Sequence, residues 1–278
     1  MTTVSKFTAA PKPTVAKAVT FAPITAAKIT PRMIINAVEG WGKTTALAHS
    51  PKPVVLMARD ETGYQTLLGS GLAPQNDGAI IETWPQLIDA LDSLVASDYQ
   101  TVGLDALAGF ERLCHEEVCR RDFGGDWSER GFGSFQKGYE QSVRDWNIML
   151  ARLDKLHASG KIILILSHSK VAGFRNPAGA DFDRYVADCH AKTWAATARW
   201  ADAVLFGKFD TMVDLKQQDR GNIQKKGKGI GGAFRVLHTE RRDAWDAKNR
   251  YGLPAQIDIP DDPSAVWSTI WNSIKKGA

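Results

Sequence analysis

The chain has 278 residues, 44% of them hydrophobic, which is enough to bury the core of one large α/β domain or of two small ones. No apolar run approaches the roughly 20 residues that a membrane-spanning helix needs, and the N-terminus lacks the charged start and apolar block of a secretory signal. We therefore expect a cytoplasmic protein with no membrane partner, in which the three cysteines remain reduced.

The net positive charge is concentrated at the N-terminus. Residues 1–31 contain four lysines and no acid, which accounts for the whole formal net charge of +4. The first 30 residues are rich in Ala, Thr, Pro and Lys and have neither a helical nor a strand period. We predict a flexible basic arm over 1–30 and one folded domain over 31–278. Since the folded part is balanced in charge, any contact with nucleic acid must be local.

A short apolar run, a glycine-containing loop and a helix-forming segment follow one another at 32–50. The run RMIINA is long enough for a buried strand, and KTTALAHS can open a helix. Strand, loop and helix in this order are the context of a phosphate-binding loop, G-x-x-x-x-G-K-[ST], whose backbone N–H groups face phosphate oxygens. The predicted nucleotide site consists of Ala37, Val38, Glu39, Gly40, Trp41, Gly42, Lys43, Thr44 and Thr45.

Two side chains of this loop have specific predicted roles. Lys43 would reach the β- and γ-phosphates of ATP, and the Thr44 hydroxyl would bind Mg²⁺. The pattern has glycine at the position of Ala37. Alanine is only one methyl group larger, so the loop tolerates it if φ is negative there.

Carboxylates follow two further apolar runs. The run 101–104 ends in Asp105, and the run 53–58 is followed by Asp60 and Glu61. The carboxyl ends of parallel strands meet at the edge of the sheet where ligands bind. We expect Asp105 to join the nucleotide site and hold Mg²⁺. Either Asp60 or Glu61 could polarise a water molecule at the γ-phosphate, although acids also favour the start of a helix.

The later part of the chain alternates apolar runs with glycine-rich segments. The run 161–170 is nearly all Ile and Leu before His168, as in a central parallel strand. His168 could sense the γ-phosphate or be an ordinary histidine at a strand end. The runs 200–210 and 234–240 predict further strands. Between them, 215–232 carries five basic residues and one acid, which indicates a basic hairpin tip.

These motifs together resemble the RecA-like ATPase core, and in detail the phage-encoded RecA-like proteins of single-strand annealing and recombination. The resemblance is carried by the phosphate loop and by the passages MARDETGYQTL, ERLCHEEVCRRDFGGDW, FRNPAGADFDRY, WADAVLFGKFD and TERRDAWDAKNRYGLP. It covers roughly 32–260. It implies an α/β fold: a mostly parallel central sheet flanked by helices, with a C-terminal antiparallel extension.

The resemblance also implies catalytic roles. Glu61 matches the glutamate that activates water, and His168 stands where RecA-like proteins carry a polar sensor. KNRYG at 248–252 is similar to a Lys-Asn-Arg-Phe-Gly stretch of the bacterial RadA ATPases, whose cations reach a neighbouring subunit's nucleotide. Lys248 and Arg250 therefore join Lys43 in the predicted catalytic set. A bond to a nearby acid is the alternative for Arg250.

The resemblance places two DNA-binding loops at 122–138 and 170–192. Both mix aromatic rings with cations, and bases can stack on such rings without sequence preference. Each ring could instead belong to the core, and the basic hairpin could be an ordinary solvated loop. The predicted DNA-binding residues are Phe123, Trp127, Arg130, Phe132, Lys170, Phe174, Arg175, Arg184, Lys225, Lys226 and Lys228.

Cysteines and histidines offer a weaker alternative site. His115 and Cys119 share a helix face, and Cys114, Cys189 and His190 could join them in binding zinc. The absence of a C-x-x-C pair argues against zinc.

The expected function is that of an ATP- and Mg²⁺-dependent protein that binds single-stranded DNA and promotes annealing or recombination. Its expected partners are single-stranded DNA, further copies of itself in a ring or filament, and a single-strand-binding protein. If the chain is phage-encoded, its compartment is the host cytoplasm. Two alternatives share the same core: a nucleotide-gated annealing module with little hydrolysis, and a helicase-like motor.

Overall fold

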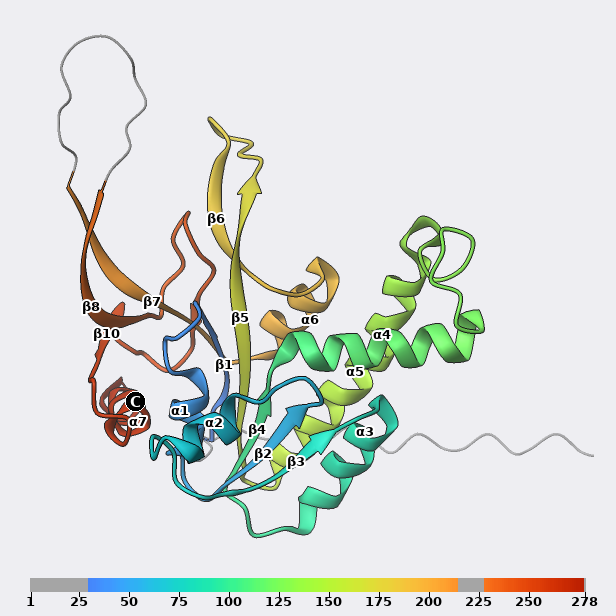
Figure 1. Ribbon diagram of the computed structural model, residues 1–278, viewed down its shortest axis with the longest axis horizontal. Coiled ribbons are helices and arrows are strands. Elements are labelled where there is room, and N and C mark those ends of the chain that lie inside the picture. Colours follow the sequence, from blue (N-terminus) through green and yellow to red (C-terminus); the bar gives the residue numbers. More distant parts are fainter. Residues whose placement is uncertain (1–29, 215–227, 278) are drawn as a thin grey trace, which may run out of the picture.

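The computed structural model describes residues 30–214 and 228–277 (Figure 1). The predicted basic arm, together with Lys225 and Lys226 of the predicted hairpin tip, lies outside the described residues. Lys228 is the first residue of a strand, but its side chain is likewise outside the description.

One large sheet forms the centre of the molecule. Its main strands, in spatial order, are β10 (Gln256–Ile259), β8 (Lys228–His238), β7 (Ala203–Asp214), β1 (Arg32–Ala37), β5 (Ile162–Phe174), β4 (Thr101–Asp105), β2 (Pro53–Ala58) and β3 (Asp77–Ile81). The strands from β7 to β3 are parallel, whereas β8 and β10 are antiparallel additions. Two further strands pair antiparallel with this set, β6 (Phe182–Ala187) with β5 and β9 (Lys248–Asn249) with β7.

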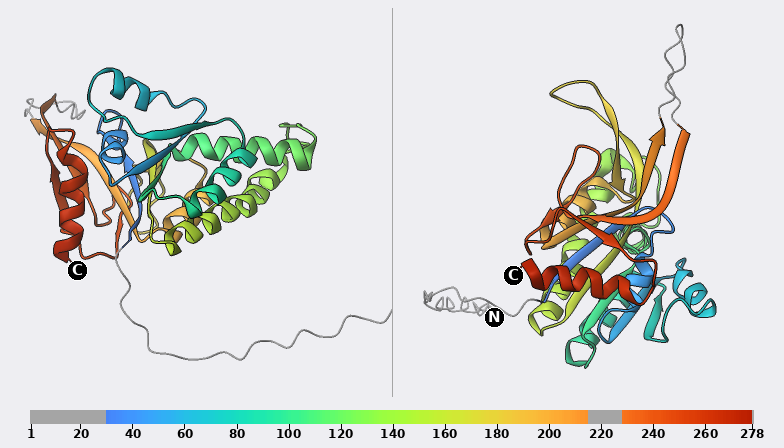
Figure 2. Two further views of the ribbon diagram at one scale, coloured as in Figure 1. Left: turned by 90° about the horizontal axis from the view of Figure 1, so that it is seen from below. Right: turned by 90° about the vertical axis from the view of Figure 1, so that its left-hand side faces the viewer.

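Helices cover both faces of the sheet (Figure 2). One face carries α1 (Lys43–Ala48), α2 (Gly63–Gly69) and α7 (Ala265–Gly277). The other carries α3 (Trp84–Ser93), α4 (Leu107–Phe123), α5 (Lys137–Ala158) and α6 (Ala191–Trp200). Two short 3₁₀ turns, Leu94–Ala96 and Ser134–Gln136, complete the elements.

The sequence pattern explains this layering. Buried residues of α7 recur at a helical spacing, Val266, Ile270 and Ile274, and belong to the same core as alternate residues of β1 such as Met33 and Ile35. The intervening β1 residue, Ile34, faces the other core. The central strands are buried on both faces, which is why they consist of unbroken apolar runs.

The predicted α/β class, with a mostly parallel central sheet flanked by helices and an antiparallel C-terminal extension, is confirmed. One prediction about its detail was wrong. The strand predicted at 161–170 extends to Phe174 and pairs with β6, so 170–192 contains a β-hairpin and the start of α6 (Figure 1).

The parallel strands bring four polar segments to one edge of the sheet. The carboxyl ends of β1 and β2 lead into the glycine loop and toward Glu61. The strand β4 ends at Asp105, and His168 lies in β5 where the pairing of that strand with β1 ends. Among the residues that the structure describes, no helix is long and apolar enough to cross a membrane.

Candidate nucleotide-binding site

The loop between β1 and α1 has the backbone shape that its glycines predict. Gly40 and Gly42 adopt φ angles of 70° and 102°, in the left-handed region that glycine enters without steric cost. Ala37 is the last residue of β1 and is not among the residues with positive φ. The condition for accepting alanine at this position is therefore met.

A glycine on the neighbouring strand makes room for Ala37. Ala37 lies opposite Gly207 of β7. A Cβ atom on residue 207 would lie 2.8 Å from the Cβ of Ala37 and 2.6 Å from the ring of Trp41. The phosphate-loop pattern places glycine at 37. In this chain residue 37 is alanine, and the glycine lies opposite it on the neighbouring strand, at 207.

Trp41 fixes the loop to the antiparallel part of the sheet. Its side chain is fully buried, and the indole nitrogen donates a hydrogen bond of 3.0 Å to the carbonyl oxygen of Val236 on β8. A buried ring in this position explains why a bulky residue occurs inside a glycine loop.

Lys43 lies beneath the loop and is 6% exposed. Its ammonium group donates to the carbonyl oxygens of Ala37, at 3.1 Å, and Val38, at 3.4 Å. Burial lowers the pKa of Lys43, and the nearby carboxylates of Asp105 and Glu61 oppose this shift. An anion beside the ammonium group would replace the solvation that burial removes.

Thr44 and Asp105 are in direct contact. The Thr44 hydroxyl donates to the Asp105 carboxylate at 2.8 Å, although the two residues are 61 positions apart. Burial raises the pKa of Asp105, and the hydrogen bond from Thr44 works against that increase. A hydroxyl and a carboxylate side by side are oxygen ligands of the type that Mg²⁺ prefers.

Glu61 and His168 face each other across the site, with 3.8 Å between Oε1 and Nε2. Asp60, the alternative to Glu61, instead forms an exposed ion pair with Arg112 of α4. Glu61 therefore lies at the pocket, whereas Asp60 is not among the residues that line it.

These groups line a pocket of about 650 Å³. The apolar part of the wall, beyond α1, consists of Leu67 and Leu72. The side next to the C-terminal strands is lined by Phe209, Arg235 and Pro263. Left-handed glycines, a buried lysine and a hydroxyl–carboxylate pair in one pocket fit a nucleoside triphosphate with Mg²⁺.

The sequence prediction missed Phe209, Arg235 and the segment that contains Pro263. Arg235 lies inside the run predicted as a strand at 234–240, but the sequence does not reveal which strand it borders. Only the register shows that it lies opposite Phe209 and next to the loop.

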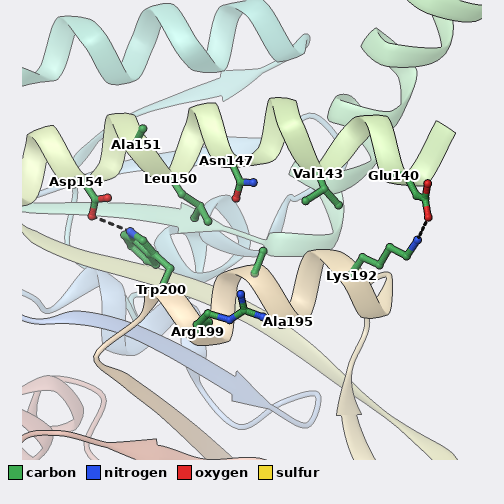
Figure 3. Close-up of a pocket in the computed structure, with 11 residues that line it drawn as sticks. Glu140, Val143, Asn147, Leu150, Ala151, Asp154, Lys192, Ala195, Arg199 and Trp200 are labelled. Atoms are coloured by element: carbon green, nitrogen blue, oxygen red, sulfur yellow. Dashed lines mark hydrogen bonds and ion pairs between the residues drawn. The ribbon is translucent and has the colours of Figure 1, made fainter. Parts of the chain in front are cut away.

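A second hollow of about the same volume lies between α5 and α6 (Figure 3). A Glu140–Lys192 ion pair of 2.5 Å crosses it at one end, and Trp200 donates to Asp154 at 2.8 Å at the other. Its floor contains Val143, Leu150 and alanines. No glycine loop followed by a helix lines this hollow. We therefore assign the nucleotide to the pocket beside Gly40, Gly42 and Lys43.

Lys248 and Arg250 lie away from the pocket of their own subunit. The strand β9 pairs with Ala203 and Val204, the start of β7, whereas the phosphate loop is beside the later residues of that strand. The Lys248 ammonium donates to three carbonyl oxygens at the C-terminal end of α6, of Ala198, Arg199 and Ala201.

Arg250 has a different environment from Lys248. Its guanidinium group is 57% exposed and pairs with Asp202 at 3.0 Å. The acid in this pair is therefore Asp202 and not one of the acids nearer in sequence. Lys248 binds the C-terminal end of a helix in its own subunit. Of the two cations expected to reach a neighbouring subunit's nucleotide, only Arg250 therefore remains a candidate.

Two of the predicted DNA-binding residues are structural. Phe132 is 1% exposed and packs with Val118 and Cys119, and its ring fills the space that a side chain on residue 138 would need. Arg184 is 8% exposed and pairs with Asp246 at 2.6 Å. Because neither side chain is free to meet a base or a phosphate, both predictions were wrong.

The other described candidates are more accessible. Trp127, Arg130 and Arg175 are exposed; Phe123 and Phe174 are half-buried against other rings; and Lys170 is exposed but paired with Asp188. The tip between α4 and α5 also presents Phe135, which is fully exposed. The DNA-binding residues predicted from the sequence include the buried Phe132 and not Phe135.

The cysteines and histidines have packing roles in the structure. His190 stacks on Tyr139 at a centroid distance of 4.6 Å, and His115 contacts the same ring. Within the described ranges 30–214 and 228–277, no group of three or more His, Cys, Asp or Glu side chains is placed to hold a metal ion.

The fold and the pocket together define a phosphate-loop nucleotide-binding protein. The family described as the AAA domain matches residues 29–251, and this chain belongs to that family. Family and fold indicate nucleotide binding and hydrolysis, with Mg²⁺ as the usual metal.

Two further comparisons add no argument about function. No curated protein matches this sequence. Among solved structures, the chain is similar to a KaiC-like protein from the hyperthermophilic archaeon Pyrococcus horikoshii OT3, with a TM-score of 0.39 and 10% identity, over 84% of this chain and 88% of that one.

Proposed function

We propose that this protein is an ATPase that binds single-stranded DNA and promotes strand annealing or homologous recombination. The observation that carries the proposal is that one unbroken strand joins the nucleotide pocket to the β5–β6 hairpin. The strand β5 runs from the nucleotide pocket, at His168, directly into the β5–β6 hairpin that bears Lys170, Phe174 and Arg175. A displacement of β5 at His168 would therefore reach the hairpin along one continuous strand, with no intervening loop.

The nucleotide part of the proposal assigns one task to each side chain. Lys43 neutralises the β- and γ-phosphates, and Thr44 and Asp105 hold Mg²⁺, which would supply further positive charge at the phosphates. Glu61 accepts a proton from the attacking water. His168 faces Glu61 across the site, so it can respond to that carboxylate and to the state of the γ-phosphate.

The DNA part of the proposal rests on accessible rings and cations. Trp127, which is 52% exposed, and Phe135 offer faces for bases at the α4–α5 tip. Arg130 and Arg175 are exposed and available to the backbone phosphates. Stacking of this kind contributes about 1–3 kcal/mol per base and does not depend on sequence.

A second candidate is a nucleotide-gated annealing module that hydrolyses ATP slowly. The specific observation in its favour is that Glu61 and His168 are 3.8 Å apart, which is longer than a hydrogen bond, so this contact does not fix the Glu61 carboxylate toward a water molecule. In both cases the acting form is a ring or filament of identical subunits, with a single-strand-binding protein as a further partner.

One experiment tests the proposal and separates the candidates. ATP turnover is measured with and without single-stranded DNA, in parallel with an annealing assay on complementary strands. Turnover stimulated by DNA supports the ATPase, whereas annealing that needs ATP binding but proceeds without turnover supports the gated module. A folded protein that binds neither ATP nor single-stranded DNA contradicts both.

A further inference from the structure

Arg235 of β8 lies against the phosphate loop. Its Nη1 atom donates a hydrogen bond of 3.1 Å to the carbonyl oxygen of Trp41, and its Nη2 atom donates to the carbonyl oxygen of Pro260. A Cβ atom on residue 42 would lie 2.6 Å from that Nη1 atom. The φ angle of 102° is what favours glycine at 42, and the guanidinium group lies directly against this residue.

The same guanidinium group lines the nucleotide pocket. It is half-buried and lies on the C-terminal side of the pocket, next to Gly42, while Lys43 approaches from beneath the loop. A guanidinium group has five N–H donors, and the two carbonyl oxygens engage only part of that set. The remaining donors and the full positive charge are available to a ligand.

Arg235 has no carboxylate as a direct partner among the described residues, although Asp261 lines the same pocket. None of the described salt bridges includes Arg235, whose two hydrogen-bond partners are uncharged carbonyl groups. The glycine loop itself supplies N–H dipoles of the same sign. Positive charge held beside a glycine loop, without a carboxylate partner, favours an anion at that point.

We propose that Arg235 is a second phosphate-binding cation of this pocket, supplied by the antiparallel extension of the sheet and independent of Lys43. This inference rests on the proposed nucleotide site and adds a residue to it. Because Arg235 also holds Pro260, it connects the phosphates to the segment that contains Pro263, which forms the pocket wall.

The test uses inorganic tripolyphosphate, which has neither base nor ribose, together with ATP. Dissociation constants are measured by thermal-shift titration for the wild type, Arg235→Lys and Arg235→Gln. Arg199→Gln is the matched control, because Arg199 is exposed and lines the other hollow. Each variant is first shown to be folded by circular dichroism.

We expect Arg235→Gln to weaken tripolyphosphate about tenfold to a hundredfold, as the loss of a charge-assisted hydrogen bond implies. Arg235→Lys keeps the charge and should recover part of that loss, and Arg199→Gln should bind like the wild type. If the role of Arg235 were purely structural, the affinities of the variants for tripolyphosphate would not follow the charge at position 235.

Two outcomes would overturn the inference: wild-type affinity in a folded Arg235→Gln protein, or equal losses in the Lys and Gln variants. Failure of the wild type itself to bind ATP would instead contradict the proposed function. Loss of binding in Lys43→Ala, with binding kept in Arg235→Gln, would leave the nucleotide site standing without Arg235.

Discussion

The hydroxyl of Thr44 and the carboxylate of Asp105 are joined by a hydrogen bond of 2.8 Å that links the first turn of α1 to the end of β4. One strand, β5, separates β4 from β1, which leads into α1. The pair therefore bridges two layers of the fold at the pocket. A displacement of either β4 or the phosphate loop would alter this hydrogen bond.

Replacing Lys43 should separate ligand binding from folding. In Lys43→Met, the buried ammonium group is replaced by an apolar side chain of similar length, so the melting temperature without ligand should stay unchanged or rise. The stabilisation that ATP gives the wild type should disappear. Differential scanning fluorimetry with and without ATP measures both effects, and a full ATP-induced shift in Lys43→Met would contradict the site.

Asp105 should make stability depend on pH. Its pKa is raised in the folded protein, so the native state holds its proton to higher pH than the unfolded chain, whose Asp pKa is about 3.9. This contribution to stability is fully present below that value and is lost as pH rises through the native pKa. Asp105→Asn removes the buried charge, so its stability advantage over the wild type should be larger at pH 7 than at pH 4.

The measurement for Asp105 is a pair of denaturant curves for each protein in metal-free buffer. Mg²⁺ should narrow the difference at pH 7, because it would stabilise the wild-type carboxylate and not the amide. A difference that is the same at both pH values, or that grows at acidic pH, would show that the carboxyl group is not the titrating group.

Glu61 and Asp60 are adjacent in sequence but have different expected roles. Glu61→Gln should lower ATP turnover about 10²- to 10⁴-fold while ATP affinity is kept, because a general base acts in the reaction and not in binding. Asp60→Asn should leave turnover within about twofold, since Asp60 is paired with Arg112 outside the pocket. Single-turnover assays with a binding titration decide the point, and the reverse ranking would move the base to Asp60.

The β5–β6 hairpin contains two arginines that should respond differently to removal. Arg175→Ala should weaken binding to single-stranded DNA and reduce the slope of log affinity against log salt by about 0.7. Arg184→Ala should lower the free energy of unfolding by about 1–2 kcal/mol, because it breaks the half-buried pair with Asp246. Lys155→Ala, an exposed cation of α5, is the control.

These DNA measurements require binding curves at four or more salt concentrations for each protein. An unchanged slope in Arg175→Ala would remove the hairpin from the DNA-binding surface. A reduced slope in Lys155→Ala would show instead that binding responds to general surface charge.

Arg250 is the remaining cation for a contact between subunits. Arg250→Ala should lower turnover without changing ATP affinity, because an arginine from a neighbour acts on the charge of the transferring phosphate. Mixing it with Lys43→Ala should restore part of the activity, since some interfaces then combine an intact Lys43 site with an intact Arg250. No recovery in proven mixed assemblies, or full activity in Arg250→Ala alone, would reject the role.

The elements of the phosphate site could be predicted because each of them leaves a local signal. Unbroken apolar runs gave β1, β2, β4 and most of β5, since strands covered on both faces lack alternation. The edge strand β3 had no such signal: its residues Asp77, Gly78, Ala79 and Ile80 are exposed, and only Ile81 is buried. The additional length of β5, Val171 to Phe174, was missed because that part is paired with β6 alone and follows the polar residues Ser169 and Lys170, where the apolar run has already ended.

Side-chain roles that depend on tertiary register could not be predicted from the sequence. Phe132 and Phe135 are three residues apart in a glycine-rich segment, yet one is buried and the other fully exposed. Lys248 resembled a cation free to reach a neighbour until the pairing of β9 with β7 placed it over the end of α6. Arg235 became visible as a pocket residue only through its pairing opposite Phe209.

The buried indole of Trp41 has a consequence for the way a nucleotide is captured. A phosphate loop composed mainly of glycine would lose conformational entropy when it closes on a ligand. Here one residue of the loop is already held by packing and by its bond to Val236, so much of that entropy is lost during folding. Nucleotide association should therefore proceed in a single kinetic phase, because the loop already has its phosphate-binding conformation before the phosphates bind.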